Sequence, residues 1–409
     1  MLIGNAIVGQ SGGPTTAINA TLSGVIRGAL SCEAIGTLYG AFNGVEGMLH
    51  DRVCNLDEIF ASEKDLVCLE HTPAAALGSC RLKLPRDGED EDTYRTLFAF
   101  FEKYNIRYFF YIGGNDSMDT VAKVSAYARK CGYDICVIGV PKTIDNDVTG
   151  TDHTPGYGSA AKYIAASVRE MLRDCAVYTV PAVTIVEIMG RDAGWLTAAA
   201  ALPGADGGDA PDLIYLPERT FSFEAFFRDV RAALERHPNV MVAVSEGLRC
   251  EDGRYVGESA QSGAADVFGH KYLSGTGKAL EIAVKEEIGC KVRSVELNIL
   301  QRCAAHIASK TDLEESVAVG RAAVEAAADG VSGKMMTLRR VSDTPYSVVP
   351  DYEDIDKIAN QVRTVPDSFI NEAGNQITPE GVRYILPMIR GESMPEFENG
   401  MPVYFRIPR

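Results

Sequence analysis

The sequence predicts an α/β protein with two doubly wound, mostly parallel-sheet domains and the active site in the cleft between them. Apolar runs of strand length alternate with amphipathic segments of helix length, which is typical of parallel sheets covered by helices on both faces. A chain of 409 residues is long enough for two such cores. Glycine-rich or charged turns follow the strands repeatedly, at the edge where open α/β sheets bind ligands.

Three strands and three helices are expected in the first 150 residues. Strands are expected at residues 3–9, 107–112 and 135–140, and helices at residues 15–30, 91–104 and 118–130. Pro14 suits the first turn of its helix, where a missing N–H costs nothing. Gly132 is expected to end the third helix. Residues 34–70 are expected to form short strands and turns.

The same alternation continues after residue 150. Strands are expected at residues 182–189, 213–216, 240–244 and 292–297, and helices at residues 154–173, 195–202, 223–236, 277–288 and 300–328. Residues 249–274 are polar and rich in glycine, which predicts a mobile loop. From residue 331 onward the pattern changes to short strands and turns with prolines.

Composition excludes several classes of protein. The formal net charge of -16 argues against nucleic acid or an anionic membrane as the main partner. The 10 cysteines are scattered without a CxxC pair, so reduced thiols in a cytoplasmic protein are expected. No apolar run has the length of a membrane span. Residues 2–9 lack a basic leader and run into a glycine turn, so no signal peptide is expected.

Residues 139–147, with the sequence GVPKTIDND, form the most informative stretch. They end a buried strand, which places Lys142, Thr143, Asp145 and Asp147 at the ligand-binding edge of a sheet. A plain surface turn remains an alternative, but it needs only one Asp or Asn with a Gly or Pro. An ammonium, a hydroxyl and two carboxylates within six positions indicate a catalytic function.

Other strand ends carry weaker signals. Gly12 and Gly13 precede a helix and could hold an anion, or could simply make a tight turn. Asp116 follows two glycines and could face a phosphate or a metal, or could cap the next helix, as could Ser117. Arg81 lies in a loop and could be an ordinary solvated side chain.

The combined chemistry favours phosphoryl transfer. The sequence contains no HExxH, no GxSxG, no Cys/His zinc spacing, no Walker A loop and no GxGxxG, which disfavours the enzyme classes with those motifs. Phosphoryl transfer needs positioning, neutralisation of charge and a base for the attacking hydroxyl. A carboxylate beside a lysine can accept that proton, and arginines can hold a sugar phosphate through paired hydrogen bonds.

These motifs, in this order and spacing, resemble those of the phosphofructokinase family, in particular its pyrophosphate-dependent branch. The resemblance covers roughly residues 1–330. It rests on residues 11–13 (SGG), 77–81 (LGSCR), 113–117 (GGNDS), 141–147 (PKTIDND), 189–191 (MGR), 246–247 (EG) and 301–302 (QR).

The resemblance implies a role for each matched residue. Asp145 would be the base toward the C1 hydroxyl of fructose 6-phosphate, with Lys142 and Asp116 as further catalytic residues. The sugar phosphate would contact Thr143, Asp145, Met189, Gly190, Arg191, Glu246 and Arg302. The phosphoryl donor, diphosphate, would lie on Gly12, Gly13 and Arg81. Arg293 resembles an arginine that reaches the sugar phosphate of a neighbouring subunit, so a homodimer or homotetramer is expected.

Two positions bear on the choice of donor. Members that use ATP carry glycine in place of Asp116, and commonly in place of Lys142. Asp116 adds bulk and negative charge where the α-phosphate of a nucleotide would lie, and Lys142 adds a cation that can hold diphosphate in the transition state. The family implies Mg²⁺ as the cofactor, with Asn115 and Asp147 as ligands.

The chain departs from the family pattern at four positions. Asn115 stands where many members have a magnesium-binding Asp, and it offers less charge. Ala182 replaces a second arginine that crosses between subunits, and Ile299 replaces a His or Tyr. Ser23 replaces an effector-site arginine of bacterial ATP-dependent enzymes, which argues against that form of allostery. An ATP-dependent phosphofructokinase and a non-catalytic regulatory subunit with the same fold therefore remain alternatives.

The resemblance also suggests a division into domains. Residues 1–147 are expected to bind the donor and to be completed by part of residues 300–350. Residues 148–300 are expected to bind the sugar phosphate. Residues 331–409 would form a C-terminal extension without a role that the sequence indicates.

Overall fold

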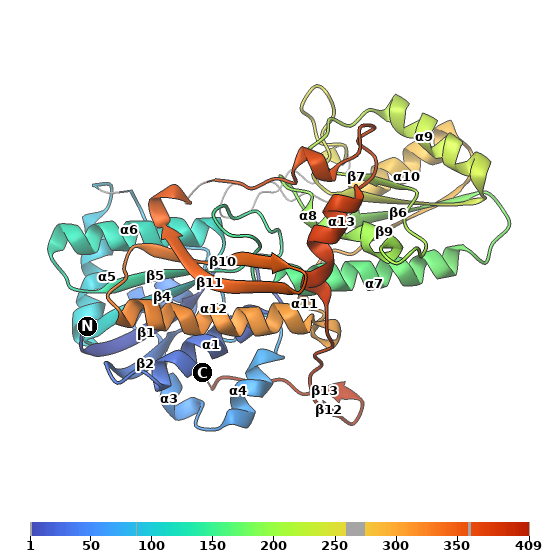
Figure 1. The fold of residues 1–409 in the computed structure, drawn as a ribbon. Coiled ribbons are helices and arrows are strands. Elements are labelled where there is room, and N and C mark those ends of the chain that lie inside the picture. The colour runs from blue at the N-terminus through green and yellow to red at the C-terminus, as the bar shows by residue number, and fades with distance from the viewer. Residues whose placement is uncertain (1, 87, 259–274, 359–360, 409) are drawn as a thin grey trace.

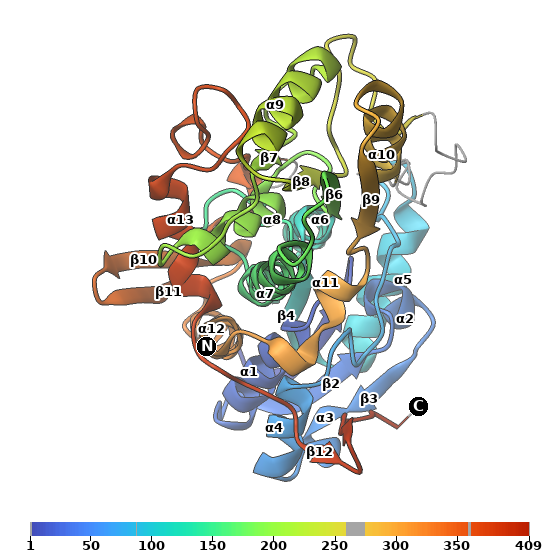
Figure 2. The same ribbon diagram turned by 90° about the vertical axis from the view of Figure 1, so that its right-hand side faces the viewer.

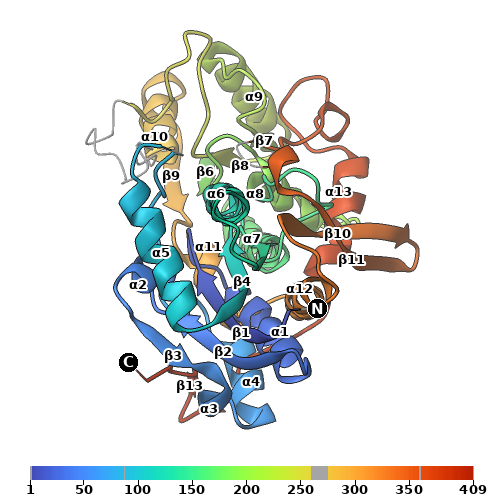
Figure 3. The ribbon, with the colours of Figure 1, turned by 90° about the vertical axis from the view of Figure 1, so that its left-hand side faces the viewer.

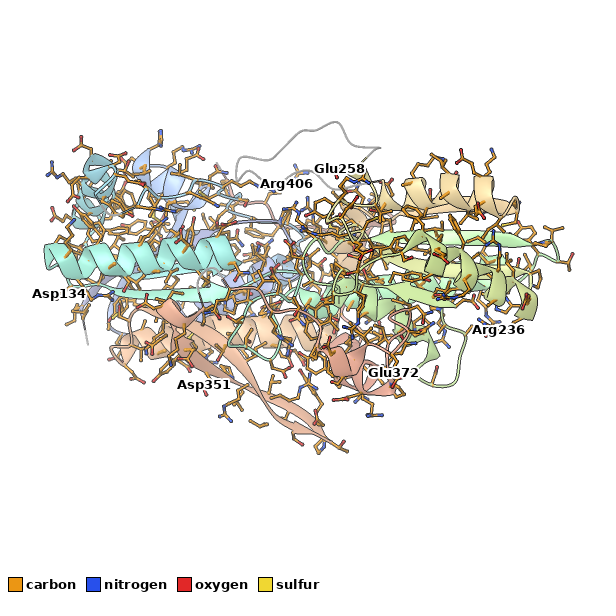
Figure 4. All side chains as sticks on the ribbon, turned by 90° about the horizontal axis from the view of Figure 1, so that it is seen from above. Asp134, Arg236, Glu258, Asp351, Glu372 and Arg406 are labelled. Carbon is orange, nitrogen blue, oxygen red and sulfur yellow. The ribbon has the colours of Figure 1, made fainter. Side chains whose placement is uncertain are left out.

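The computed structural model describes residues 2–86, 88–258, 275–358 and 361–408. Two lobes lie end to end, each built on its own sheet (Figure 1). Asp134 and Arg236 mark the opposite ends of the molecule (Figure 4). The expected two-sheet α/β class is confirmed. Most of the loop expected at residues 249–274 lies outside the described residues.

The first lobe contains a seven-stranded sheet in the order β11-β10-β5-β4-β1-β2-β3. Its central strands run parallel, and only the edge strands β3 and β11 are antiparallel to their neighbours. The strands are β1 (Gly4–Gln10), β2 (Ile35–Ala41), β3 (Val53–Asn55), β4 (Ile106–Gly113), β5 (Cys136–Pro141), β10 (Lys334–Asp343) and β11 (Tyr346–Asp354).

Helices cover both faces of this sheet because its central strands are apolar on both sides. Tyr108 and Phe110 of β4 belong to one buried cluster, while Phe109 and Tyr111 belong to another on the opposite face. Fully burying a side chain such as Phe109 contributes about 1.5–3 kcal/mol. The helices of this lobe are α1 (Ile18–Leu30), α2 (Gly44–Leu49), α3 (Leu56–Ile59), α4 (Glu63–Glu70), α5 (Glu91–Lys103), α6 (Asn115–Cys131) and α12 (Lys310–Ala328).

The second lobe contains a four-stranded parallel sheet in the order β7-β8-β6-β9. Its strands are β6 (Ala182–Ile188), β7 (Leu213–Tyr215), β8 (Asn239–Ser245) and β9 (Lys291–Glu296). Its helices are α7 (Tyr157–Cys175), α8 (Trp195–Ala198), α9 (Phe223–Arg236), α10 (Thr276–Glu287), α11 (Leu300–Cys303) and α13 (Pro379–Ile385). Short 3₁₀ helices lie at Ala199–Gly204, Ala305–Ile307, Ile355–Lys357, Asp367–Phe369 and Leu386–Ile389. A small hairpin joins β12 (Phe397–Glu398) to β13 (Met401–Pro402).

The chain returns to the first lobe after the second sheet is complete. Helix α12 packs beside α1 (Figures 2 and 3), and β10 then pairs with β5. The two helices approach closely because glycines meet: a Cβ on Gly24 would lie 2.1 Å from the oxygen of Val317, and one on Gly320 would lie 2.2 Å from that of Thr21. The division into domains at residues 147 and 300 stays a prediction.

Several expectations about local structure are wrong. Residues 34–70 contain three helices besides their strands. Helix α1 begins three residues later than expected, because the carbonyl of Thr15 accepts the N–H of Ala74 and the chain stays irregular up to Ala17. Pro14 therefore lies outside the helix. Helix α6 begins at Asn115, capped by Gly114 without a side-chain bond, so neither Asp116 nor Ser117 is its cap.

The C-terminal part also differs from the expectation of short strands and turns. Strands β10 and β11 are 10 and 9 residues long and form a hairpin on the first sheet. β10 pairs with β5 only at Lys334 and Met335, and its length comes from the antiparallel pairing with β11, which runs from Lys334 to Asp343. All 10 cysteines are free thiols. Among the described residues, no helix is both long and apolar enough to cross a membrane.

Candidate active site

A cavity of about 410 Å³ lies between the two lobes, at the carboxyl ends of strands from both sheets. It brings together residues that are far apart in the sequence. Gly12 and Arg191 line the same cavity, as expected for a site between two domains. The lining residues are Gly12, Gly13, Pro14, Thr15, Arg81, Gly114, Asn115, Asp116, Ser117, Lys142, Thr143, Ile144, Asp145, Asp147, Met189, Arg191, Asp192, Ala193, Glu246, Arg302 and Val362.

The β5–α7 loop, residues 142–156, supplies the ammonium group of the site. Lys142 is buried, with 2% of its surface exposed, and its Nζ donates to the carbonyl of Gly13 at 2.5 Å. Burial lowers the pKa of Lys142 to about 8, although the carboxylate of Asp145 opposes the shift. A Cβ on Gly12 would lie 3.5 Å from Nζ, so the glycine turn and the lysine face each other.

Asp145 projects from the same loop into the cavity. Its backbone N–H donates to Thr143 Oγ1 at 3.2 Å, and that hydroxyl lies 3.3 Å from Asp145 Oδ2. Burial raises the pKa of Asp145, whereas the hydroxyl of Thr143 and the charges of Lys142 and Arg191 oppose the rise. Asn146 takes a left-handed conformation at φ 53° and accepts the N–H of Thr154 at 3.0 Å, which turns the loop.

Asp147 and Asn115 form a second polar group in the cavity. Asn115 Nδ2 donates to Asp147 Oδ2 at 3.2 Å, while the buried Oδ1 of Asn115 has no hydrogen-bond partner. Burial and the nearby charge of Asp145 raise the pKa of Asp147 to about 7. Within the described ranges, no group of three or more His, Cys, Asp or Glu side chains could hold a metal.

These two side chains nevertheless fit magnesium. Mg²⁺ keeps several waters and is usually held by one or two protein oxygens together with substrate phosphates. An unpartnered amide oxygen beside a carboxylate supplies such a pair of ligands.

The first-lobe wall of the cavity carries the residues expected to contact the donor. Gly12 has a φ of 77°, and its N–H donates to the carbonyl of Cys80 at 3.1 Å, next to Arg81. Asp116 lies in the first turn of α6 and forms an ion pair with Lys83 at 3.1 Å. Both partners are partly exposed, so this pair lies toward the mouth of the cavity.

The second-lobe wall is built by the β6–α8 loop, residues 189–194, and by the end of β8. The N–H of Gly190 donates to Glu246 Oε1 at 3.4 Å, and the N–H of Met189 donates to Gln301 Oε1 at 3.3 Å. Burial raises the pKa of Glu246 to about 8. Gly190 itself does not line the cavity, but it orients Glu246 beside it.

Arg293 lies elsewhere. It projects from the edge strand β9 into a separate shallow depression, lined also by Tyr178, Ala182 and Lys291. The geometry within one chain therefore does not bring it to the cavity, and its action across a subunit interface stays a prediction.

Sequence reasoning assigned no role in the site to several residues that line the cavity. Thr15 and Ser117 have buried hydroxyl oxygens without hydrogen-bond partners. Asp192 forms an ion pair with Arg249 at 2.9 Å. Their positions beside predicted residues could have identified them. Val362 lies in the C-terminal part, and no motif in the sequence signals it.

Comparisons with known proteins agree with the motifs. A family model described as phosphofructokinase matches residues 5–327. The pyrophosphate–fructose 6-phosphate 1-phosphotransferase of Xanthomonas campestris pv. campestris is 44% identical over 412 residues, with 100% of this chain and 97% of that protein covered. The protein of the same name from Halomonas elongata is 42% identical over 410 residues, with 99% and 96% covered.

The fold is also similar to that of a solved structure. The crystal structure of a pyrophosphate-dependent phosphofructokinase from Nitrosospira multiformis is similar with a TM-score of 0.89 at 37% sequence identity. The match covers 99% of this chain and 98% of that one.

Proposed function

Because this chain belongs to the phosphofructokinase family, we propose that it transfers a phosphoryl group from diphosphate to the C1 hydroxyl of fructose 6-phosphate. The products are fructose 1,6-bisphosphate and phosphate, and the reaction is reversible. The observation that carries the proposal is the meeting of Gly12, Lys142, Asp145 and Arg191 around one cavity.

Asp145 is the base of the proposed reaction. The C1 oxygen attacks a phosphorus of diphosphate, its proton passes to Asp145, and the bond to the leaving phosphate breaks. The raised pKa of Asp145 supports this role, because a base works best when its pKa approaches the working pH. The bond with Thr143 holds the carboxylate in place.

Lys142 stabilises the charge on the transferred group and on the leaving phosphate. With a pKa of about 8, it is still mostly protonated at pH 7. It lies against the Gly12–Gly13 turn, where backbone can approach a phosphate closely. A fixed cation in a cavity shielded from water stabilises developing charge more strongly than one in bulk water.

The sugar phosphate occupies the second-lobe side of the cavity. Thr143, Asp145, Met189, Gly190, Arg191, Glu246 and Arg302 are its proposed contacts. A guanidinium can bind a phosphate through two parallel hydrogen bonds, which suits Arg191 and Arg302. Arg293 is proposed to reach the sugar phosphate of a neighbouring subunit, so the active form is a homodimer or homotetramer.

Magnesium is the proposed cofactor, held by Asn115 Oδ1 and Asp147. When bound with diphosphate, it neutralises phosphate charge and orients the donor. Asn115 and Asp147 supply only one formal negative charge between them, so the phosphates must supply more of the binding.

The choice of donor rests on Asp116, Lys142 and Arg81. Asp116 is expected to exclude the chain of a nucleotide triphosphate, and its ion pair with Lys83 supports this by holding the carboxylate in place. No nucleic acid or membrane is a proposed partner, and the proposed location is the cytoplasm.

A donor comparison tests the function. Purified protein with fructose 6-phosphate and Mg²⁺ is given either diphosphate or ATP, and fructose 1,6-bisphosphate is measured with a coupled aldolase assay. We expect turnover with diphosphate and little with ATP. Preference for ATP would support the ATP-dependent alternative, and no turnover with either donor would support a non-catalytic subunit.

A further inference from the structure

Residues 362–365, which we call the strap, contact both walls of the cavity. They lie beyond residue 327, where the match to the family model ends. After β11 the chain passes from the first lobe to α13 in the second (Figure 1). The strap lies on this crossing, and its residue Val362 lines the cavity itself.

On the first-lobe side, the strap supports the backbone of Asp147. The N–H of Arg363 donates to the carbonyl of Asp147 at 2.7 Å. Val362 and Val148 form an antiparallel bridge immediately beside this bond. The proposed magnesium ligand is therefore fixed through main-chain contacts with the strap.

On the second-lobe side, the strap fixes the end of the β6–α8 loop. The indole Nε1 of Trp195 donates to the carbonyl of Arg363 at 3.0 Å. The N–H groups of Gly194 and Val365 both donate to Glu218 Oε1 at 2.8 Å. Strap and loop thus share one carboxylate oxygen, which holds them at a fixed separation.

The side chain of Arg363 joins these contacts. Its guanidinium lies 4.4 Å from the ring centre of Trp195, which is fully buried. It donates to the carbonyls of Thr151, at 3.3 Å, and Asp152, and to the hydroxyl of Tyr384 at 2.6 Å. One planar side chain therefore connects the β5–α7 loop, α8 and α13, a task that its rigid fork suits better than a lysine would.

We infer that the strap fixes the β5–α7 loop relative to the β6–α8 loop, and that Arg363 is the positioning residue on which this depends. The role of the strap in turnover rests on the proposed function, because that reaction requires the donor-binding wall and the sugar-binding wall to keep a fixed relative position. Displacing a reacting group by about 1 Å can lower the rate about 100-fold. Loosening the strap therefore affects catalysis without removing any group that touches substrate.

Arg340 provides a matched control. Like Arg363, it is a largely buried arginine that lies over the ring of Tyr384, at 4.4 Å, and bonds to Asp152, at 3.0 Å. Among the described residues, its guanidinium donates to Asp152, Asp343 and the carbonyl of Tyr384, and not to Asp147 or Trp195. Arg340→Met should lower stability much as Arg363→Met does, but it leaves the strap in place.

The experiment compares Arg363→Met, Arg363→Lys and Arg340→Met with the wild type. For Arg363→Met we expect kcat to fall by about 10–100-fold, with the KM for fructose 6-phosphate changed less than about 3-fold. The Mg²⁺ concentration for half-maximal rate should rise, because loss of the guanidinium bonds loosens the strap, whose main-chain N–H at residue 363 holds the carbonyl of Asp147. Arg363→Lys should recover part of kcat, and Arg340→Met should keep kcat within about 2-fold.

Amide hydrogen exchange gives a readout that does not depend on activity. We expect faster exchange in residues 146–149 and at Gly194 for Arg363→Met, but not for Arg340→Met, whose partner in the β5–α7 loop is Asp152. Equal losses of kcat in the two methionine variants, or unchanged exchange in Arg363→Met, would overturn the inference. If the wild type shows no turnover with any donor, the proposed function fails, whereas the exchange result still decides whether the strap fixes the two loops.

Discussion

Replacing Asp116 with glycine should shift the donor preference of the enzyme toward ATP. Asp116 lines the cavity in the first turn of α6, with its carboxylate 3.1 Å from Lys83. Diphosphate is short, so its distal phosphate ends where the chain of ATP would continue. A carboxylate at this point repels the next phosphate of a nucleotide, and its removal also breaks the ion pair with Lys83.

The size of the shift follows from the exposure of the pair. Two unit charges about 4 Å apart repel by about 1 kcal/mol in water and by about 4 kcal/mol at an effective dielectric constant near 20. The side chain of Asp116 keeps 40% of its surface exposed and is paired with a cation, so a value near the lower limit applies. About 1–2 kcal/mol corresponds to a shift of about 5–30-fold in the ratio of kcat/KM for ATP to that for diphosphate.

The assay measures kcat/KM for both donors at saturating fructose 6-phosphate and fixed Mg²⁺. Asp116→Gly should raise the ratio of kcat/KM for ATP to that for diphosphate, and it should lower the activity with diphosphate. The double variant Asp116→Gly with Lys142→Gly should also favour ATP over diphosphate when compared with the wild type. Asp116→Asn removes the charge but keeps the bulk, so it separates the two effects. Asp119→Gly places a glycine in the same helix, at a residue paired with Lys123, and controls for lost helix stability.

The reasoning is refuted if the donor ratio moves toward ATP in neither the single nor the double variant. Donor choice would then lie elsewhere, first of all in the loop around Arg81.

Three further predictions concern the base, the oligomer and stability. Asp145→Asn should keep the fold and sugar binding but lower kcat by about 10²–10⁴-fold; near-normal turnover in a verified variant would exclude Asp145 as the base. Light scattering during turnover should find a dimer or larger species, with Arg293→Ala raising the KM for fructose 6-phosphate; a fully active monomer would contradict the interface role. Burial opposes the charge of His153, but Asp152, at 2.8 Å, and Glu315, at 2.7 Å, outweigh it and raise its pKa to about 9. Because the folded-state pKa lies above the ordinary value, this stabilisation is complete below about pH 6.5 and is lost as the pH rises through 9. Urea unfolding should therefore show up to about 3 kcal/mol less stability at pH 9 than at pH 6.5. The decrease should be smaller in His153→Gln, and an equal decrease in both proteins would argue against the assignment.

The regular part of the fold could be predicted because its strands are apolar on both faces. The continuous apolar runs at residues 107–112 and 135–140 are typical of buried strands, and β4 and β5 lie there. The helices within residues 34–70 were missed because they are short, and short helices give little periodic signal. The hairpin of β10 and β11 was underestimated because its outer half is exposed, so its apolar pattern is weak.

The candidate site could be predicted where a strand end is marked by unusual chemistry. Lys142 and Asp145 belong to such a cluster, and both line the cavity. The sequence of the strap contains no comparable cluster of functional side chains at a strand end. Its contacts with Asp147 and Trp195 are made largely by main-chain groups, which any residue can supply. The strap meets Asp147 and Trp195 only because the chain crosses the cleft a second time. The local pattern of apolar and polar residues does not indicate that crossing.

Phosphorus NMR on a single reaction mixture tests the central proposal most directly. The purified protein is mixed with fructose 6-phosphate, diphosphate and Mg²⁺, and the resonances of diphosphate, phosphate and the C1 phosphate ester are followed together. The account predicts that each diphosphate consumed yields one phosphate and one C1 ester, and that adding phosphate to fructose 1,6-bisphosphate regenerates diphosphate. Loss of diphosphate without formation of the ester, or no reaction until ATP is supplied, would contradict it.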